Sequence, residues 1–260
     1  MVLAGQYLER SVVVRSGEIS LDALYHRGKQ EPPCLMASPH PALGGSMIAP
    51  VIAELAWALT RAGHATMRFD YRGVGASQGS SHHAAGSLAP GARLGPEDLR
   101  EEREDLAAVA DQLCATTHAA SFCAVGYSFG ASVVLAAAED ARISHLILVA
   151  PPTAIADFSA VARVGKPLLV VCAHHDNLCN RAALQALLPR TAKLEVLPHT
   201  DHYFLRGLTE LGKIVAAWLR GDRPEYIAPA DPPEEQGSEA RELELEEGDP
   251  LELDEDNPES

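Results

Sequence analysis

The sequence has no hydrophobic run long enough to cross a membrane. A spanning helix needs roughly 20 consecutive apolar residues, and no hydrophobic run here approaches that length. Residues 1–15 also lack the basic-then-apolar order of a signal peptide. The five cysteines are an odd number, and most lie in hydrophobic runs, which favours buried free thiols in a reducing compartment. We therefore expect a cytoplasmic protein without membrane insertion.

A surplus of basic charge is also missing. The net charge is -15, and residues 221–260 hold 16 of the 36 acidic residues but only two of the 21 basic ones. The rest of the chain is nearly neutral, so its charge does not indicate nucleic acid or an anionic membrane as a partner. Residues 223–260 are rich in Pro, Glu and Asp, which predicts an acidic disordered tail behind a folded domain of residues 1–222. We expect the tail to aid solubility, and its partner stays open.

Two ligand-binding patterns are incomplete. The glycine-rich segment 70–77 lacks the Gly-Lys-Ser/Thr ending of a nucleotide loop and the full Gly-x-Gly-x-x-Gly spacing. We interpret it as a structural turn in which Asp70 and Arg72 bond locally. Residues 174–176 and 199–202 could supply imidazole and carboxylate ligands to a metal. No His-x-His pair upstream completes a metallohydrolase set, so we expect no metal and no cofactor.

Hydrophobic runs alternate with amphipathic helices along the chain. Segments 11–14 and 19–25 flank Gly17, which is typical of an antiparallel hairpin. Further strands are expected at 34–37, 65–69, 121–125, 143–149, 168–173 and 194–197, and helices at 47–62, 96–116, 129–139, 179–188 and 203–220. Continuous Val, Ile and Leu runs between helices predict a mostly parallel sheet that is covered on both faces.

One segment carries the pattern of a catalytic nucleophile. Gly126-Tyr127-Ser128-Phe129-Gly130 follows a hydrophobic strand and precedes a helix-forming segment. A strand that turns sharply into a helix presents a serine at its apex as a nucleophile. Glycine on either side fits because only a residue without Cβ tolerates the close approach of strand and helix. We interpret Ser128 as the nucleophile.

A serine hydroxyl needs a base within hydrogen-bond reach and a carboxylate that orients the base. On parallel sheets these groups follow the nucleophile in the chain order Ser, Asp or Glu, His. Asp176 comes just beyond the strand 168–173, and His202 lies in the loop between the strand 194–197 and the last helix. The carboxyl ends of neighbouring parallel strands meet at one edge. We therefore predict a triad of Ser128, Asp176 and His202, with His199 as the alternative base.

The tetrahedral intermediate needs backbone N–H donors aimed at its oxyanion. Phe129, the residue after the nucleophile, should supply one of them. The loop after strand 34–37 should supply the other, and there Pro39 and Pro41 have no N–H to give. We predict Ala42 as the second donor, with Leu43 as the alternative.

The chain resembles the α/β-hydrolase fold superfamily over residues 12–219. The segments that carry the resemblance are the turn Phe69–Ser77, the nucleophile elbow 126–130 and the oxyanion loop 40–45. Within the superfamily it is similar to small lidless hydrolases with a His-Pro-x-x-Gly-Gly oxyanion loop and a Gly-Tyr-Ser-Phe-Gly elbow. The resemblance implies an α/β-hydrolase fold with an eight-stranded, mostly parallel sheet, helices on both faces and no cap domain. It also implies a serine hydrolase mechanism with the roles given above.

The expected reaction is hydrolysis of a carboxylic ester through an acyl-enzyme on Ser128. Residues 150–166 are too few for a folded cap, so the site should be open to small acyl substrates, flanked by the loop around His82 and His83. A thioesterase or a serine peptidase would use the same triad. A binding protein on a hydrolase fold is the non-catalytic alternative, because a fold does not dictate function.

Overall fold

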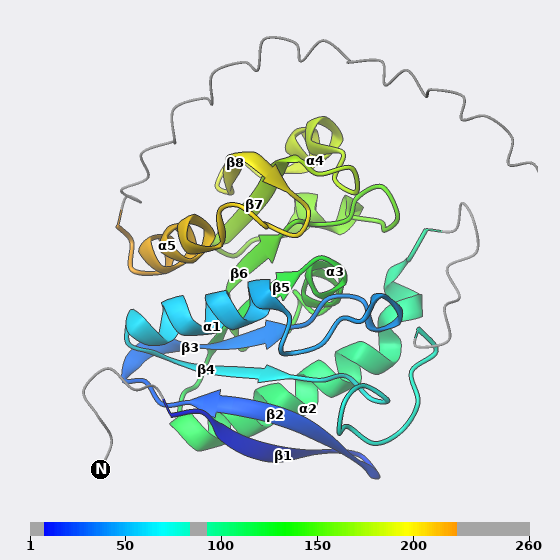
Figure 1. Cartoon of the computed structure of the whole chain (residues 1–260), viewed down its shortest axis with the longest axis vertical. Coiled ribbons are helices and arrows are strands. Elements are labelled where there is room, and N and C mark those ends of the chain that lie inside the picture. Colours follow the sequence, from blue (N-terminus) through cyan, green and yellow to red (C-terminus); the bar gives the residue numbers. More distant parts are fainter. Residues whose placement is uncertain (1–7, 84–92, 223–260) are drawn as a thin grey trace, which may run out of the picture. The chain divides into compact units, whose positions relative to one another are not determined.

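The computed structural model describes residues 8–83 and 93–222. In these residues eight strands form one sheet in the order β1-β2-β4-β3-β5-β6-β7-β8 (Figure 1). The strands are β1 (Arg10–Ser16), β2 (Ile19–His26), β3 (Gln30–Ala37), β4 (His64–Phe69), β5 (Phe122–Tyr127), β6 (Ile143–Val149), β7 (Leu168–His175) and β8 (Lys193–Asp201). The β1–β2 and β2–β4 pairs are antiparallel and all other pairs are parallel. The predicted hairpin and mostly parallel sheet are confirmed.

Helices cover both faces of this sheet, as the uninterrupted hydrophobic strands predict. They are α1 (Pro50–Arg61), α2 (Arg100–Thr117), α3 (Phe129–Ala136), α4 (Arg181–Leu187) and α5 (Leu208–Leu219), with short 3-10 turns η1 (Pro41–Leu43), η2 (Pro96–Leu99) and η3 (Ser159–Arg163). Successive strand residues point to opposite faces. In β7, Val170 belongs to the core under α2 and α3, whereas Val171 belongs to the core under α1 and α5.

Helix boundaries differ from the predicted ones where side chains bind backbone N–H groups. The first helix begins at Pro50 rather than near Met47, because the N–H of Met47 donates to the Asp70 carboxylate (2.6 Å). The last helix begins at Leu208 rather than at Tyr203. There the Asp201 carboxylate accepts the N–H of Tyr203 (3.1 Å), which holds a turn in front of the helix.

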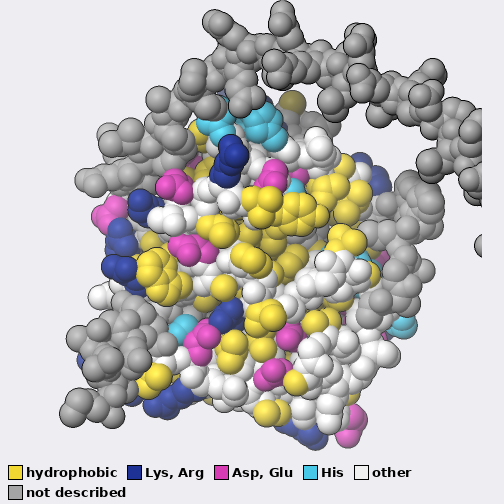
Figure 2. All heavy atoms as spheres, in the orientation of Figure 1, with side chains coloured by type: hydrophobic (Ala, Val, Ile, Leu, Met, Phe, Trp, Pro, Cys, Tyr) yellow, Lys and Arg dark blue, Asp and Glu magenta, His cyan; other side chains and the backbone are white. Residues whose placement is uncertain are grey.

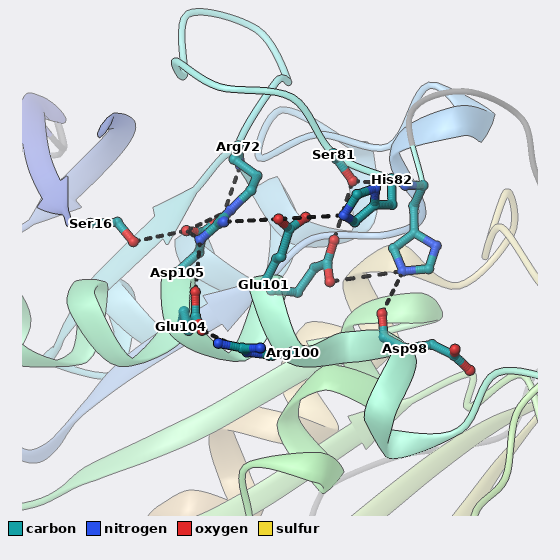
Figure 3. Close-up of polar contacts among 11 residues, drawn as sticks. Ser16, Arg72, Ser81, His82, Asp98, Arg100, Glu101, Glu104 and Asp105 are labelled. Atoms are coloured by element: carbon teal, nitrogen blue, oxygen red, sulfur yellow. Dashed lines mark hydrogen bonds and ion pairs between the residues drawn. The ribbon is translucent and has the colours of Figure 1, made fainter. Parts of the chain in front are cut away.

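The glycine-rich segment 70–77 forms a structural turn, in which the Ser77 hydroxyl donates to the Asp70 carbonyl (2.8 Å), but its charged side chains bond to distant segments. The Arg72 guanidinium pairs with Asp105 on α2, 33 positions away, with Nη2 2.7 Å from Oδ1. Figure 3 shows Ser16 and Glu101 also reaching toward this pair. Asp105 is completely buried, and a buried carboxylate needs such partners to offset its lost hydration. The expectation of local bonds is therefore confirmed for the backbone of Asp70 and wrong for Arg72.

Between β6 and β7 the described chain contains only the short turn η3, so no lid covers the sheet edge there. No helix in residues 8–83 or 93–222 is long and hydrophobic enough to span a bilayer. The predicted tail, residues 223–260, lies outside the described residues and stays a prediction, as does the proposed domain boundary before it.

Candidate active site

Ser128 sits at a strained turn between β5 and α3. Its backbone has φ 54° and ψ -118°, which a residue with a side chain rarely adopts. The glycines on either side are required by crowding: a Cβ on Gly126 would lie 2.2 Å from the Gly130 carbonyl oxygen, and one on Gly130 would lie 2.2 Å from that of Ala37. The turn therefore exists because the sequence places glycine at both positions, and it lifts the serine above the sheet edge.

The structure brings the three predicted triad residues together. His202 Nε2 lies 2.9 Å from Ser128 Oγ, and His202 Nδ1 lies 2.9 Å from Asp176 Oδ2. With Nδ1–H donated to the carboxylate, Nε2 is free to accept the serine hydroxyl proton. Of the two candidate bases, His202 rather than His199 makes these contacts. The arrangement can activate a nucleophile.

Two hydrogen bonds help to fix the orientation of the acid and the base. The Asp176 carboxylate accepts the N–H of Leu178 (2.8 Å), and its side chain is only 1% exposed. The Tyr127 hydroxyl donates to the His202 carbonyl (3.1 Å). Burial, together with the nearby Tyr203 and Asp176, holds the pKa of Tyr127 well above its usual value, so it stays a neutral donor. Because the triad is largely shielded from water, its electrostatic interactions are stronger than at the surface.

One predicted oxyanion donor is available and the other is already used. The N–H of Phe129, at the start of α3, donates to no group in the part of the chain that the structure describes. The N–H of Ala42 donates to His40 Nδ1 (3.1 Å), and that of Leu43 donates to the His40 carbonyl (3.1 Å). Ala42 therefore stays a predicted oxyanion donor. Its N–H could donate to the oxyanion only after its hydrogen bond to His40 Nδ1 has broken.

The backbone N–H of His40 is a donor that sequence reasoning missed. Between Pro39 and Gly45 every other backbone N–H donates within the loop, and within the described residues that of His40 has no acceptor. The His40 ring also packs edge-on against Phe129, with ring centroids 4.8 Å apart. The sequence signal for this donor was the order Pro39-His40-Pro41. Neither proline has a backbone N–H, so His40 has the one N–H of these three residues.

The His40 side chain is held neutral beside the nucleophile turn. Burial, with the nearby His83, lowers its pKa from 6.5 to about 4. A neutral ring lets Nδ1 accept the Ala42 N–H, which caps the turn η1. The His83 ring contacts both His40 and Phe129, with centroid distances of 5.6 and 5.2 Å. His83 therefore flanks the candidate site as predicted, while residues 84–92 of that loop lie outside the described residues.

Hydrophobic side chains are exposed next to the triad. Leu43 follows His40 in the oxyanion loop, and Tyr203 and Leu205 follow His202; each is at least 61% exposed. Figure 2 shows further hydrophobic side chains exposed over the middle of the face that is in view there. By contrast, no group of three or more His, Cys, Asp or Glu side chains in residues 8–83 or 93–222 is arranged so that it could hold a metal ion.

Known proteins with similar sequences and structures include several hydrolases. Residues 44–164 match a family model described as serine aminopeptidase, S33. Over 201 residues the chain is 24% identical to an uncharacterized protein of Rickettsia prowazekii, in a match that spans 72% of this chain and 78% of that protein. A serine hydrolase homologue from Coxiella burnetii is 26% identical, with a TM-score of 0.67 over 84% of this chain and 99% of its own. A lidless serine hydrolase from Xanthomonas campestris is 27% identical, with a TM-score of 0.66 over 86% and 97%.

These similarities and the sheet topology define the class of protein. The chain has an α/β-hydrolase fold with an eight-stranded, mostly parallel sheet, as predicted, and residues 8–83 and 93–222 contain no folded lid. In sequence and structure it is similar to α/β serine hydrolases from Coxiella burnetii and Xanthomonas campestris.

Proposed function

We propose that this protein is a serine hydrolase that cleaves small carboxylic esters with Ser128 as its nucleophile. The observation that carries the proposal is the unbroken hydrogen-bond chain from Ser128 Oγ through both ring nitrogens of His202 to Asp176. A serine alone is too weak an acid to attack a carbonyl, and this chain supplies the base that it needs.

In the proposed mechanism Ser128 Oγ attacks the ester carbonyl while His202 Nε2 takes the hydroxyl proton. The negative charge of Asp176 stabilises the imidazolium that forms. The N–H groups of Phe129 and His40 donate to the developing oxyanion, with Ala42 as the other candidate for the second position. His202 then protonates the leaving alcohol, and water releases the acyl group by the reverse sequence. The reaction needs no cofactor.

The surroundings of the serine favour small acyl substrates. No lid covers the site in the described part of the chain, which leaves it open to small substrates and offers no walls for a long lipid chain there. The exposed side chains of Leu43, Tyr203 and Leu205 offer hydrophobic surface to an acyl or aryl group.

Peptide hydrolysis is the second candidate, and the family description favours it. The matched residues, 44–164, include Ser128 but end before Asp176 and His202. The match therefore bears on the nucleophile turn and not on the complete triad. The same residues could also cleave a thioester.

A panel of aryl esters, thioesters and aminoacyl amides, assayed with the full-length protein, separates the three activities. Ester cleavage should show the highest kcat/KM, and a faster amide reaction would favour the peptidase.

Reaction with a fluorophosphonate probe tests the nucleophile directly. We expect rapid labelling of the full-length protein, and no labelling of Ser128→Ala or His202→Ala. Ser132→Ala is the matched control, because Ser132 is a buried serine one turn further along α3. Labelling of the Ser128→Ala variant at the normal rate would contradict the proposal. Absence of labelling in the unaltered protein would favour a binding protein on this fold.

We further propose that the enzyme acts in the cytoplasm, which accords with its five free cysteines. The partner expected is a small acyl substrate and not a nucleic acid or a membrane. Any partner of the acidic tail stays open.

A further inference from the structure

Two cysteines lie in contact on either side of the proposed triad acid. The Sγ atoms of Cys172, in β7, and Cys179, in the segment that follows, are 3.6 Å apart. Asp176 lies on the chain between them. We propose that this pair is a redox modification site, in which a peroxide oxidises Cys179 and Cys172 then forms an intramolecular disulfide that displaces Asp176. Its effect on turnover rests on the proposed function; the formation of the bond does not.

The other cysteines do not combine a partner with access to solvent. Cys34 and Cys123 face each other on neighbouring strands β3 and β5, but neither has any exposed surface. Cys114 is partly exposed on α2, and no hydrogen bond among the described residues joins it to another cysteine. Cys179 is partly exposed and touches a second thiol. Among the described residues, Cys172 and Cys179 are therefore the one pair of cysteines in contact of which a member is partly exposed to solvent.

The surroundings of Cys179 favour its thiolate. A hydrogen bond from the Cys172 thiol lowers the pKa of Cys179, and a second one from Thr153 acts in the same direction; burial and the Asp176 charge offset part of the effect. The same hydrogen bond and burial raise the pKa of Cys172. The thiolate is the nucleophilic form of cysteine, so Cys179 attacks first and Cys172 acts second.

The chemistry balances with hydrogen peroxide as the oxidant. The Cys179 thiolate attacks one peroxide oxygen, the O–O bond breaks, and the hydroxide that leaves takes a proton to become water. This gives a sulfenic acid at Cys179. Cys172 then loses its proton and attacks the Cys179 sulfur, the S–O bond breaks, and a second water leaves. Two thiols thus give two electrons to one peroxide, and a dithiol reductant reverses the change by exchange.

The new bond would act on the triad through the backbone next to Cys179. A disulfide is about 2.05 Å long, so the two sulfur atoms must approach by about 1.5 Å. Cys172 lies within the sheet, paired with Val196 of β8, so the movement falls mainly on Cys179. The preceding residue, Leu178, donates its N–H to Asp176 Oδ1 (2.8 Å). Displacing that donor changes the orientation of the carboxylate that holds His202.

Peptide mapping of the full-length protein tests bond formation. The reduced protein is treated with hydrogen peroxide, its remaining thiols are alkylated, and the peptides are analysed by mass spectrometry. We expect a Cys172–Cys179 disulfide to form before any change at Cys34, Cys114 or Cys123, and dithiothreitol to reverse it. Oxidation of Cys114 first, or of no cysteine, would overturn the site.

Single substitutions assign the two roles. In Cys172→Ser, Cys179 should stop at the sulfenic acid and react with dimedone. In Cys179→Ser, peroxide should leave Cys172 reduced. Cys114→Ser is the matched control and should form the disulfide normally. A disulfide that forms between two molecules, or dimedone labelling at Cys172 in the Cys179→Ser variant, would contradict the assignment.

The rate of fluorophosphonate labelling at Ser128 measures the effect on the triad. Oxidation should slow it about tenfold or more, since the orienting carboxylate is worth about 10⁴ in kcat in serine proteases, and dithiothreitol should restore it. Cys179→Ser should keep its rate in peroxide. An equal loss in that variant would overturn the link to Asp176. If the reduced protein never reacts at Ser128, the proposed function fails, and the peptide map still decides the disulfide.

Discussion

The carbonyl oxygen of Ala37, at the end of β3, lies 2.2 Å from the place that a Cβ on Gly130 would occupy. Gly130 is in the first turn of α3, two residues after the proposed nucleophile. The helix that carries Ser128 can therefore approach the strand that carries the oxyanion loop only because this position has no side chain. The contact sets the distance between the nucleophile and the donors of the loop.

Replacing Gly130 by alanine should destabilise the protein by at least about 3 kcal/mol, because the methyl group meets backbone that cannot move without shifting a buried strand. Urea denaturation measures the change. Gly165→Ala is the control: a Cβ there meets nothing within 4 Å, so the free energy of unfolding should change by less than about 1 kcal/mol. Equal losses in the two variants would contradict the steric argument.

The backbone N–H of His40 can be removed with little change in backbone shape. His40 has φ -62°, which is close to the angle that proline requires. His40→Ala removes the side chain and keeps the N–H, whereas His40→Pro removes both. If the N–H donates to the oxyanion, kcat of the proline variant on an aryl ester should be about 10²–10³-fold below that of the alanine variant. Equal kcat values in the two folded variants would mean that the His40 N–H does not donate to the oxyanion. Ala42 would then be the candidate for the second donor.

The pKa of His40 makes a definite contribution to the pH dependence of stability. It is about 4 in the folded protein against an ordinary value of 6.5. As the pH falls from about 6.5 to about 4, the unfolded chain binds a proton at this residue and the folded chain does not, so the free energy of unfolding decreases. Above about 6.5 both forms are neutral and the contribution stays constant.

His40→Asn should reduce this decrease. Asparagine keeps an oxygen that can accept the Ala42 N–H but does not titrate. Urea denaturation of both proteins at several pH values between about 4 and about 7 gives the difference. His64 and His145, whose pKa values burial also lowers, are present in both proteins and cancel. Parallel pH curves for the two proteins would show that the proton uptake occurs elsewhere.

The ion pair between Arg72 and Asp105 should matter far more than the surface pairs near it. Asp105→Ala leaves a mostly buried guanidinium without its main partner and should cost about 3 kcal/mol. Arg100 pairs with Glu104 one turn away on the same helix and is 83% exposed, so Arg100→Gln should cost less than about 1 kcal/mol. Thermal or urea unfolding compares the two, and similar losses would mean that burial does not strengthen the pair.

Local patterns in the sequence were enough for the elements and for the sharp turn at Ser128. Buried strands appear as continuous hydrophobic runs, so seven residues of β6 were predicted at their observed bounds. The elbow around Ser128 could be predicted because its glycines lie next to the serine in the chain. Ends of helices were less predictable: the start of α1 depends on Asp70, a residue from a distant segment.

What the sequence by itself determined is the list of chemical groups and their order: an elbow serine, then an aspartate and a histidine after later strands. Only the tertiary structure decided which histidine meets the serine, since His202 and Ser128 are 74 positions apart. It also decided that Arg72 pairs with Asp105, that His40 keeps a free N–H, and that Cys172 touches Cys179. Each of these contacts depends on how separate segments pack against one another. The hydrophobic periodicity of one segment carries no information about its packing against another.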